Sequence, residues 1–241
     1  MQATLFEFRH RWWVIFFLFF AAFSAYSFDR ANCGVAIADW LARRWGATAG
    51  ANGYRVVFAA GALLVALAAW LRTWGTAYLR AEVMRDSQVH AERLLADGPY
   101  RHVRNPLYLG NILLAAGIGL MASRIGFLVL SLGMTIFVVR LILREEAELV
   151  RGQGEAYRRY CAAVPRLAPS LVPRVPAGGN RPRWGQAVAA ESMYWLLSGS
   201  LAAFAITLRI KVFWGVFAAA AAASWLLKRA WTKRNQPAAP E

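Results

Sequence analysis

Three clusters of side chains that could bind a ligand or take part in catalysis lie between residues 97 and 166, each beside a long apolar run. The first, residues 97–111, combines arginines, a histidine, two tyrosines and an Asn-Pro step. The second is the acidic pair Glu145-Glu146, and the third is a segment of tyrosines and arginines over residues 157–166. Polar density at the edge of an apolar span costs free energy, so we interpret these clusters as parts of a site.

The Asn-Pro step predicts the start of a helix. Proline fits the first helical position and asparagine is a favoured N-cap, so we expect Asn105 to cap a helix that begins at Pro106. The free amides and positive end of that helix suit a carboxylate, and Arg101, His102 and Arg104 would strengthen this preference. The simpler interpretation is a plain helix start, with Arg104 near lipid phosphate.

The acidic pair is expected to face this helix start. Consecutive helical residues point about 100° apart, so Glu145 and Glu146 cannot share one face. Glu148 is expected to pair with Arg144 on a solvated face. Because the apolar runs 106–123 and 125–143 are separated only by a short turn, they predict a hairpin. That hairpin would bring the acidic pair within side-chain reach of Asn105.

The third cluster has helical periodicity and follows an interruption that we expect at Gly152-Gln153-Gly154. Tyr157, Tyr160, Cys161 and Val164 fall on one helix face, which is typical of an interfacial amphipathic helix and equally of a lid over a flat ring. Acids for a cation, bases for a carboxylate and tyrosines for a ring together match the needs of S-adenosylmethionine. A nicotinamide dinucleotide would also suit the arginines and the helix end.

The elements that must position these clusters are apolar helices. The chain has 241 residues, of which 59% are hydrophobic, and its charges lie in blocks between apolar runs. This pattern predicts an all-α polytopic membrane bundle of about six transmembrane helices with an amphipathic segment at the cytosolic face. The six runs are residues 12–28, 56–71, 106–123, 125–143, 187–208 and 212–227.

The charge distribution predicts an orientation. With the N-terminus inside, 21 of the 28 Lys and Arg residues fall in inner segments. We therefore expect a multi-pass protein of the bacterial inner membrane with both termini cytoplasmic. Arg43 and Arg44 fall on the outer side, which an interfacial piece at 35–45 would explain. The first run is expected to remain as a signal anchor.

Composition also excludes other classes. The net charge of +15 does not form an aromatic-interleaved basic stripe on a soluble domain, so we expect no nucleic-acid partner. The two cysteines and three histidines are too scattered for a disulfide framework or a metal site. The expected partner is the lipid bilayer, and the oligomeric state stays open.

Four segments are expected along the chain. Residues 1–93 hold the N-terminal spans and a cytosolic loop that is helical over 72–95, and residues 94–170 hold the core hairpin with its closing segment. Five of the nine prolines lie between positions 165 and 182, which predicts an extended connector over 171–185. Residues 186–241 hold a second hairpin and a tail.

The ordered set of motifs resembles a known family. Gly98-Pro-Tyr-Arg-x-x-Arg-x-Pro-x-Tyr-x-Gly110, a hairpin, Glu145-Glu146-x-x-Leu149, then a Tyr-x-x-Tyr pair and Val164-Pro-Arg166 are similar to the isoprenylcysteine carboxyl methyltransferase and phospholipid methyltransferase group. The resemblance covers residues 94–169. It implies an integral membrane enzyme that uses S-adenosylmethionine at the cytosolic face, without a Rossmann fold.

The resemblance also implies site residues. The catalytic candidates are Arg104, Glu145, Glu146 and Arg166. The cofactor-binding candidates are Tyr100, Arg101, Asn105, Tyr108, Leu109, Gly110, Glu145, Glu146, Tyr157 and Tyr160. Asn105 stands where the family often has histidine, so we expect it to orient groups rather than move protons.

The acceptor is expected to be lipophilic. A prenylcysteine or isoprenoid carboxylate needs no general base, whereas a phospholipid amine does. Two alternatives remain open: a sterol-type membrane reductase that uses NADPH, and a non-catalytic membrane protein on the same scaffold. The two C-terminal spans lie outside the family's usual core.

Overall fold

The computed structural model describes residues 2–46, 48, 50–79 and 97–234, with side chains up to position 226. Every regular element within these residues is a helix, which confirms the predicted all-α fold. The elements are α1 (Leu5–Arg9), α2 (Arg11–Ser24), η1 (Ala25–Ser27), α3 (Cys33–Arg44), α4 (Ala51–Tyr78), η2 (Gly98–Arg101), α5 (Pro106–Gly119), α6 (Arg124–Ala163), α7 (Trp184–Ala190), α8 (Ser192–Thr207) and α9 (Ile210–Arg234).

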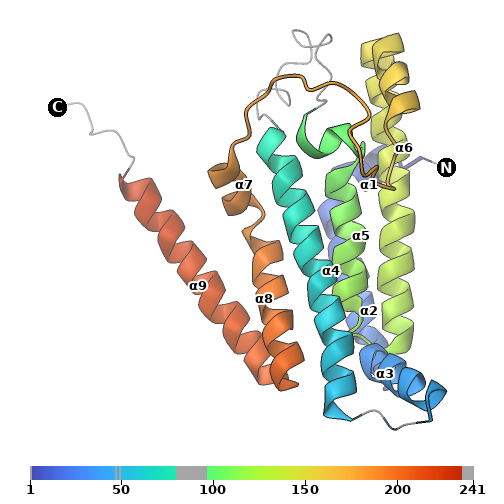
Figure 1. Cartoon of the computed structure of the whole chain (residues 1–241), viewed down its shortest axis with the longest axis vertical. Helices are drawn as coiled ribbons and strands as arrows, with labels where there is room; N and C mark the ends of the chain where they lie inside the picture. The colour runs from blue at the N-terminus through green and yellow to red at the C-terminus, as the bar shows by residue number, and fades with distance from the viewer. Residues whose placement is uncertain (1, 47, 49, 80–96, 235–241) are drawn as a thin grey trace.

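The long helices form an antiparallel bundle (Figure 1). α4 packs against α5 and α8, α6 packs against α5 and α2, and α9 packs on α8. In the view of Figure 1 the upper end of the bundle carries α1, η2 and the segment that joins α6 to α7, whereas α3 lies across the lower end. The three sequence clusters therefore meet at the upper end.

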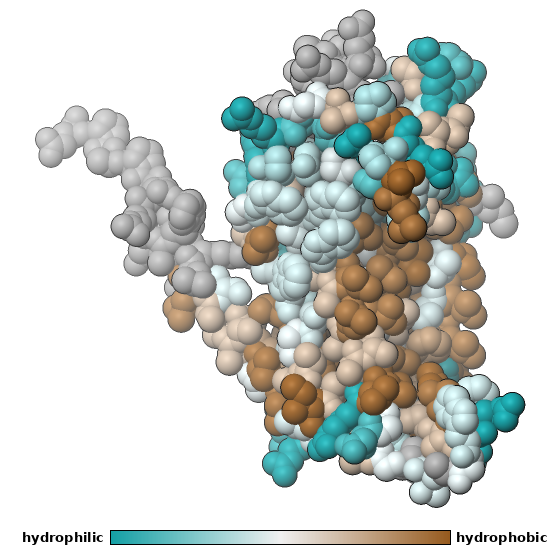
Figure 2. Space-filling view, in the orientation of Figure 1, coloured by the Kyte–Doolittle hydropathy of each residue, from teal (hydrophilic) through white to brown (hydrophobic). Residues whose placement is uncertain are grey.

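On the face that Figure 2 shows, apolar residues gather along the middle of the bundle. Two helices, α4 and α6, are long and apolar enough to cross a membrane, and four shorter apolar helices accompany them. α2 alone exposes Trp12, Trp13, Phe16, Phe17 and Phe20. A soluble monomer rarely exposes so large an apolar patch, whereas lipid would cover it at no cost. Each of the six predicted apolar runs falls on helices of this bundle.

Small residues let the central helices approach closely. A Cβ at Gly117 on α5 would lie 2.6 Å from the carbonyl oxygen of Gly61 on α4, and one at Gly61 would lie 3.0 Å from the carbonyl oxygen of Gly117. In lipid no hydrophobic driving force acts between helices, so close packing of this kind is what stabilises their association. The α4–α5 contact therefore fixes the first helix of the site hairpin against the bundle.

Both predicted hairpins are confirmed. α5 and α6 are joined by a short turn, where the Ser123 hydroxyl caps α6 by accepting from the Gly126 amide at 3.0 Å. Asp29 closes the turn from outside by accepting from the Arg124 guanidinium at 2.9 Å. α8 and α9 reverse direction at Leu208, which has a left-handed φ of 55°.

Other local predictions are also met within the described residues. α6 has the expected interruption, because Gly154 leaves helical geometry with φ of 57° and ψ of −129°. Residues 164–183 contain no helix, as the prolines predict. The helix expected over 72–95 is present as far as Tyr78, and residues 80–96 lie outside the described residues. The four segment boundaries stay predictions.

Candidate active site

The loop that leads into α5 is held from above by the α6–α7 connector. Asp97 is buried, and its carboxylate accepts from the amides of Gly178 at 2.7 Å and Asn180 at 2.9 Å, and from the Asn180 side chain at 2.7 Å. Burial alone would raise the pKa of Asp97, but the hydrogen bonds from Asn180 and Gly178 outweigh it and lower the pKa below its usual range. Asp97 is therefore an ionised latch for the connector.

Gly98 makes the turn that follows this latch. Its φ is +54°, and a Cβ there would collide with the ring of Tyr78 at the end of α4. Glycine is the residue that adopts this conformation without cost. The turn then delivers Tyr100 into the interior, where its carbonyl accepts from the Tyr160 hydroxyl at 2.7 Å. Burial raises the pKa of the Tyr100 phenol, which keeps it neutral.

The expected capping role of Asn105 is wrong. The residue occupies the N-cap position of α5, but its side chain makes no capping bond. Its ψ of 58° departs from the extended geometry of an N-cap. The side-chain amide instead donates to Glu146 at 3.2 Å and to the Arg166 carbonyl at 3.3 Å. Asn105 thus joins the helix start to the acidic pair and the closing segment.

Glu146 is the centre of the site. Its carboxylate is buried, with one oxygen 3.2 Å from Arg104 Nε and the other 2.8 Å from Arg166 Nη2 and 3.0 Å from Arg166 Nε. Arg104 also donates to the Cys161 carbonyl at 2.8 Å, and its backbone amide donates to the Pro165 carbonyl at 2.9 Å. These contacts confirm that the Asn105 end, the acidic pair and the closing segment lie within reach of one another.

The two acids are used differently, as their 100° separation predicts. Glu145 accepts from the Tyr108 hydroxyl at 2.6 Å and does not line the hollow beside Glu146. Tyr108 itself packs with residues of α2 and α6. Glu148 pairs with Arg144 at 3.1 Å on the more exposed face, as expected. The structure therefore separates Glu145 and Tyr108 from Glu146.

A hollow of about 460 Å³ opens beside Glu146. It is lined by Arg104, Leu143, Glu146, Ala147, Val150, Arg151, Cys161 and Arg166. Three guanidinium groups and one carboxylate give it a net positive charge. Arg104 Nε is buried against Glu146 in a 3.2 Å ion-pair contact that does not have hydrogen-bond geometry, and it has no hydrogen-bond partner among the described residues. The net positive charge of the lining suits an anionic group.

Several predicted site residues lie elsewhere. Arg101 donates to the Val175 carbonyl at 2.9 Å, and the His102 ring lies 2.8 Å from the Ser170 carbonyl, so both hold the connector rather than enrich the anion site. Gly110 is buried against Arg72 of α4. Leu109 is half-buried on α5 and does not line the hollow.

The tyrosines of the closing segment form a cluster of their own. Tyr157, Tyr160 and Val164 are buried together, and the two rings lie 5.8 Å apart. The predicted common helix face is therefore confirmed. The rings do not line the hollow, so their expected contact with a flat ligand ring stays a prediction.

The sequence interpretation missed one polar cluster, which joins α4, α5 and α8. Arg72 and Glu191 form a buried ion pair with a 2.6 Å contact, and Asn111 and Tyr194 complete the cluster. These residues are far apart in sequence, so no local motif connects them. The available signal was Glu191 itself, a charged residue inside an apolar run.

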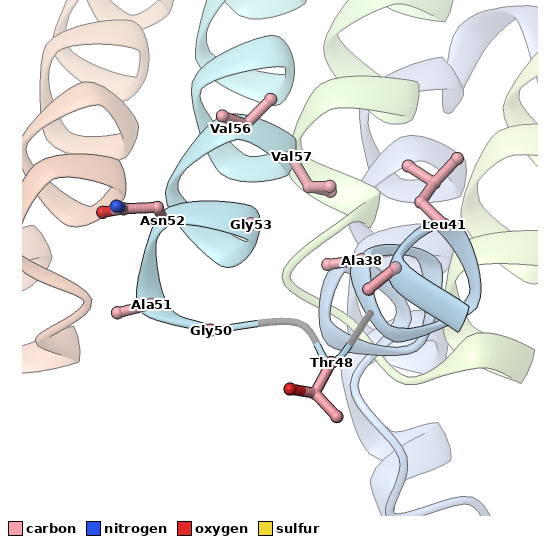
Figure 3. Close-up of a pocket in the computed structure, with 10 residues that line it drawn as sticks. Ala38, Leu41, Thr48, Gly50, Ala51, Asn52, Gly53, Val56 and Val57 are labelled. Atoms are coloured by element: carbon pink, nitrogen blue, oxygen red, sulfur yellow. The ribbon is translucent and has the colours of Figure 1, made fainter. Parts of the chain in front are cut away.

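The part of the chain that the structure describes has another hollow, at the opposite end of the bundle. Its volume is about 630 Å³, and its lining includes Ala38, Leu41, Thr48, Gly50 and Val56. Figure 3 shows these short side chains around the start of α4. Its lining holds no charged side chain, so its chemistry is poorer than that of the hollow beside Glu146. No group of His, Cys, Asp and Glu within the described residues could hold a metal ion.

Fold and site together define a helical membrane protein with a charged pocket at one end of its central hairpin. Residues 56–155 match the family model PEMT, phospholipid methyltransferase, which confirms the predicted resemblance and implies a membrane methyltransferase. The match spans most of α4, all of α5 and most of α6, and it contains Arg104 and Glu146. Tyr157, Tyr160 and Arg166 lie beyond it. Neither a curated protein nor a solved structure matches the chain.

Proposed function

We propose that the chain is an S-adenosylmethionine-dependent methyltransferase that methylates a lipophilic acceptor at one face of a membrane. The observation that carries this proposal is the convergence on Glu146 of Arg104, Asn105 and Arg166 beside a hollow of about 460 Å³. That volume lies within the range of pockets for small molecules. The family match supplies the reaction class.

The proposal includes six membrane crossings. The six apolar helices alternate in direction along the bundle in Figure 1, and the hollow, α1 and the end of α9 all lie toward its upper end. The excess of Lys and Arg in the segments at this end supports a cytoplasmic location for it. The upper end also carries the connector residues and Asp97, which need water or protein partners.

The residues of the hollow fit the proposed cofactor. The guanidinium groups of Arg104, Arg151 and Arg166 line the hollow and suit the carboxylate of an amino-acid group. Arg166 has a side chain that is 44% exposed, so it can turn toward a ligand without disrupting the core. Glu146 already accepts from the Arg166 guanidinium and the Asn105 amide and forms an ion pair with Arg104, so its main role is to hold those groups in place.

The mechanism rests on positioning. S-Adenosylmethionine, when bound, supplies an electrophilic methyl group on a sulfonium. In-line displacement then depends on alignment and on exclusion of water. Arg104 and Arg166 would orient the anionic groups, while Leu143, Ala147 and Val150 provide apolar walls beside them.

The charge of the hollow favours an acidic acceptor. Among the described residues that line it, Glu146 is the one carboxylate and is occupied by ion pairs, so this part of the lining offers no free base to deprotonate an amine. A prenylcysteine or isoprenoid carboxylate is already ionised at neutral pH and needs no base. We therefore favour such a carboxylate over a phospholipid amine as the methyl acceptor.

A thermal-shift experiment in detergent tests the proposal. S-Adenosylhomocysteine is expected to raise the melting temperature of the wild-type protein, and NADPH is not. The Glu146→Gln variant is expected to lose this stabilisation relative to its own baseline, because Arg104 and Arg166 lose their common anchor. Glu148→Gln is the matched control, since Glu148 lies two residues further along α6 and outside the hollow.

Two outcomes would overturn the proposal. Stabilisation by NADPH alone would favour the sterol-type reductase, for which the positive hollow would serve phosphate groups. Stabilisation by neither ligand would favour a non-catalytic protein. Equal loss of stabilisation in both glutamate variants would show that Glu146 has no special part in ligand binding.

A further inference from the structure

The C-terminal hairpin is tied to the site hairpin by one arginine. Arg72, near the end of α4, forms a two-point ion pair with Glu191, with Nε–Oε2 at 2.6 Å and Nη2–Oε1 at 3.1 Å. Glu191 stands directly before α8 and also accepts from the Thr76 hydroxyl at 2.7 Å. Arg72 is 9% exposed and Glu191 is 6% exposed, so the pair is shielded from water.

The same guanidinium reaches α5. Its Nη1 donates to the Leu107 carbonyl at 3.1 Å and to Asn111 Oδ1 at 2.9 Å. The Tyr194 ring of α8 lies 4.3 Å from the guanidinium carbon, and its hydroxyl donates to Asn111 at 2.7 Å. Arg72 thus holds the first turns of α5 from one side while α8 holds Arg72 from the other.

The backbone of α5 is shaped for this contact. A Cβ at Gly110 would collide with the side chain of Arg72 and would lie 3.3 Å from the Ala68 carbonyl. Gly110 is the last residue of the helix-start motif. Because any side chain at position 110 would collide with Arg72, glycine is needed there for the guanidinium to reach Leu107 and Asn111.

We propose that Arg72 is a positioning residue for the candidate site and that the C-terminal hairpin completes the site through it. α5 begins one residue after Asn105 and two after Arg104, which both contact Glu146. A shift of the first turn of α5 would move these groups relative to Glu146. The catalytic part of the proposal rests on the proposed function, whereas the structural part does not.

The geometry requires an arginine. Three separate nitrogens of Arg72 serve Glu191, Leu107 and Asn111. A lysine side chain has a single nitrogen, so it cannot reproduce the planar set of donors that bonds Glu191 and α5 at the same time. An Arg72→Lys variant would therefore keep the charge that Glu191 needs but lose the link to α5.

The test compares three variants of the full chain in detergent. In R72M/E191L both charges are replaced together by apolar groups, which avoids a buried unpaired charge and favours folding. Arg72→Lys tests the geometry at constant charge. Trp195→Phe is the matched control, because the Trp195 ring donates to Thr73 of α4 at 3.0 Å across the same α4–α8 contact and not to a residue of α5.

Two measurements give independent answers. Hydrogen–deuterium exchange of amides 109–113 reports the order of the first turns of α5 without any ligand. We expect exchange about tenfold faster in R72M/E191L and in Arg72→Lys, and unchanged in Trp195→Phe. In the same two variants the kcat of methyl transfer is expected to fall about tenfold, whereas the KM for S-adenosylmethionine stays within about twofold of the wild-type value. This is the pattern expected when alignment is lost but binding is kept.

The outcomes are separable. Unchanged exchange in R72M/E191L and Arg72→Lys would overturn the proposal, whatever the activity. Faster exchange with unchanged kcat would overturn the catalytic part. If the wild-type protein neither binds S-adenosylhomocysteine nor transfers a methyl group, the proposed function fails, and the exchange experiment still decides whether Arg72 positions α5.

Discussion

Replacing Asp97 by asparagine should release the connector that closes the upper end of the bundle. Asp97 accepts three hydrogen bonds at 2.7, 2.9 and 2.7 Å, shared between its two carboxylate oxygens. In D97N one oxygen becomes an NH₂ group that faces donors, so the variant loses the charge and at least one bond. Hydrogen bonds to charged groups are worth about 1.5–3 kcal/mol each. We expect a local loss of about 3 kcal/mol.

Limited proteolysis measures this loss. Arg174 is an exposed trypsin site in the connector. If cleavage requires local opening, a loss of about 3 kcal/mol corresponds to cleavage after Arg174 that is roughly 100-fold faster. Asp39→Asn is the matched control, because Asp39 accepts from Tyr54 at the other end of the bundle and does not touch the connector.

The latch should also depend on pH. Because hydrogen bonds lower the pKa of Asp97 in the folded protein, its stabilisation is complete above the ordinary value of 3.8 and is lost as the pH falls through the lower folded-state value. With a protease that is active at acid pH, the difference in cleavage rate between D97N and the wild-type protein should therefore shrink as the pH falls. A change in cleavage rate below threefold at pH 7 would refute the latch.

Two further predictions concern α5. Gly110→Ala should destabilise the protein by about 2 kcal/mol, because the new methyl group would collide with the side chain of Arg72. Gly152→Ala is the control and should be neutral or slightly stabilising, because a methyl group there meets open space. Chemical denaturation of both variants measures the difference. Tyr108→Phe should cost about 1–3 kcal/mol, because the half-buried carboxylate of Glu145 loses its donor. It should leave the Kd for S-adenosylhomocysteine within about threefold, because neither residue lines the hollow. A Kd weakened by tenfold or more would place Tyr108 in the ligand site after all.

Sequence patterns were sufficient for the helices. Apolar run lengths and the short break at Ser123-Arg124 predict the hairpin, and the hairpin in turn predicts that Glu146 meets the Asn105 end. The prediction for Gly154 also holds, since glycines in an otherwise helical stretch mark a break. These features depend on periodicity and chain connectivity, which a sequence records directly.

Side-chain direction was harder to predict. Asn105 is a good N-cap by type, but the backbone before Pro106 turns its amide toward Glu146 instead. Arg101 and His102 adjoin the site in sequence but hold connector carbonyls in space. Such choices depend on partners that lie 41 to 74 positions away in the sequence, and residue type and spacing do not determine them.

Long-range partnership was not predictable at all. Arg72 and Glu191 are separated by 119 positions. Arg72 has an ordinary interpretation as a charge at the end of a span, and the position of Glu191 inside an apolar run does not say which residue it pairs with. Only the packing of α8 on α4 brings them together. The same holds for Gly110, whose role became clear only when Arg72 was seen to cross it.

The hollow beside Glu146 is expected to serve methyl transfer. The most direct measurement incubates the purified protein with membrane lipid extract and with S-adenosylmethionine that carries a labelled methyl group, and then analyses the labelled product. We expect a lipid-soluble, base-labile methyl ester that forms with the wild-type protein and with Glu148→Gln but not with Glu146→Gln. A base-stable N-methyl product would contradict a carboxylate acceptor, and the absence of labelled lipid with the wild-type protein would contradict methyl transfer in this hollow.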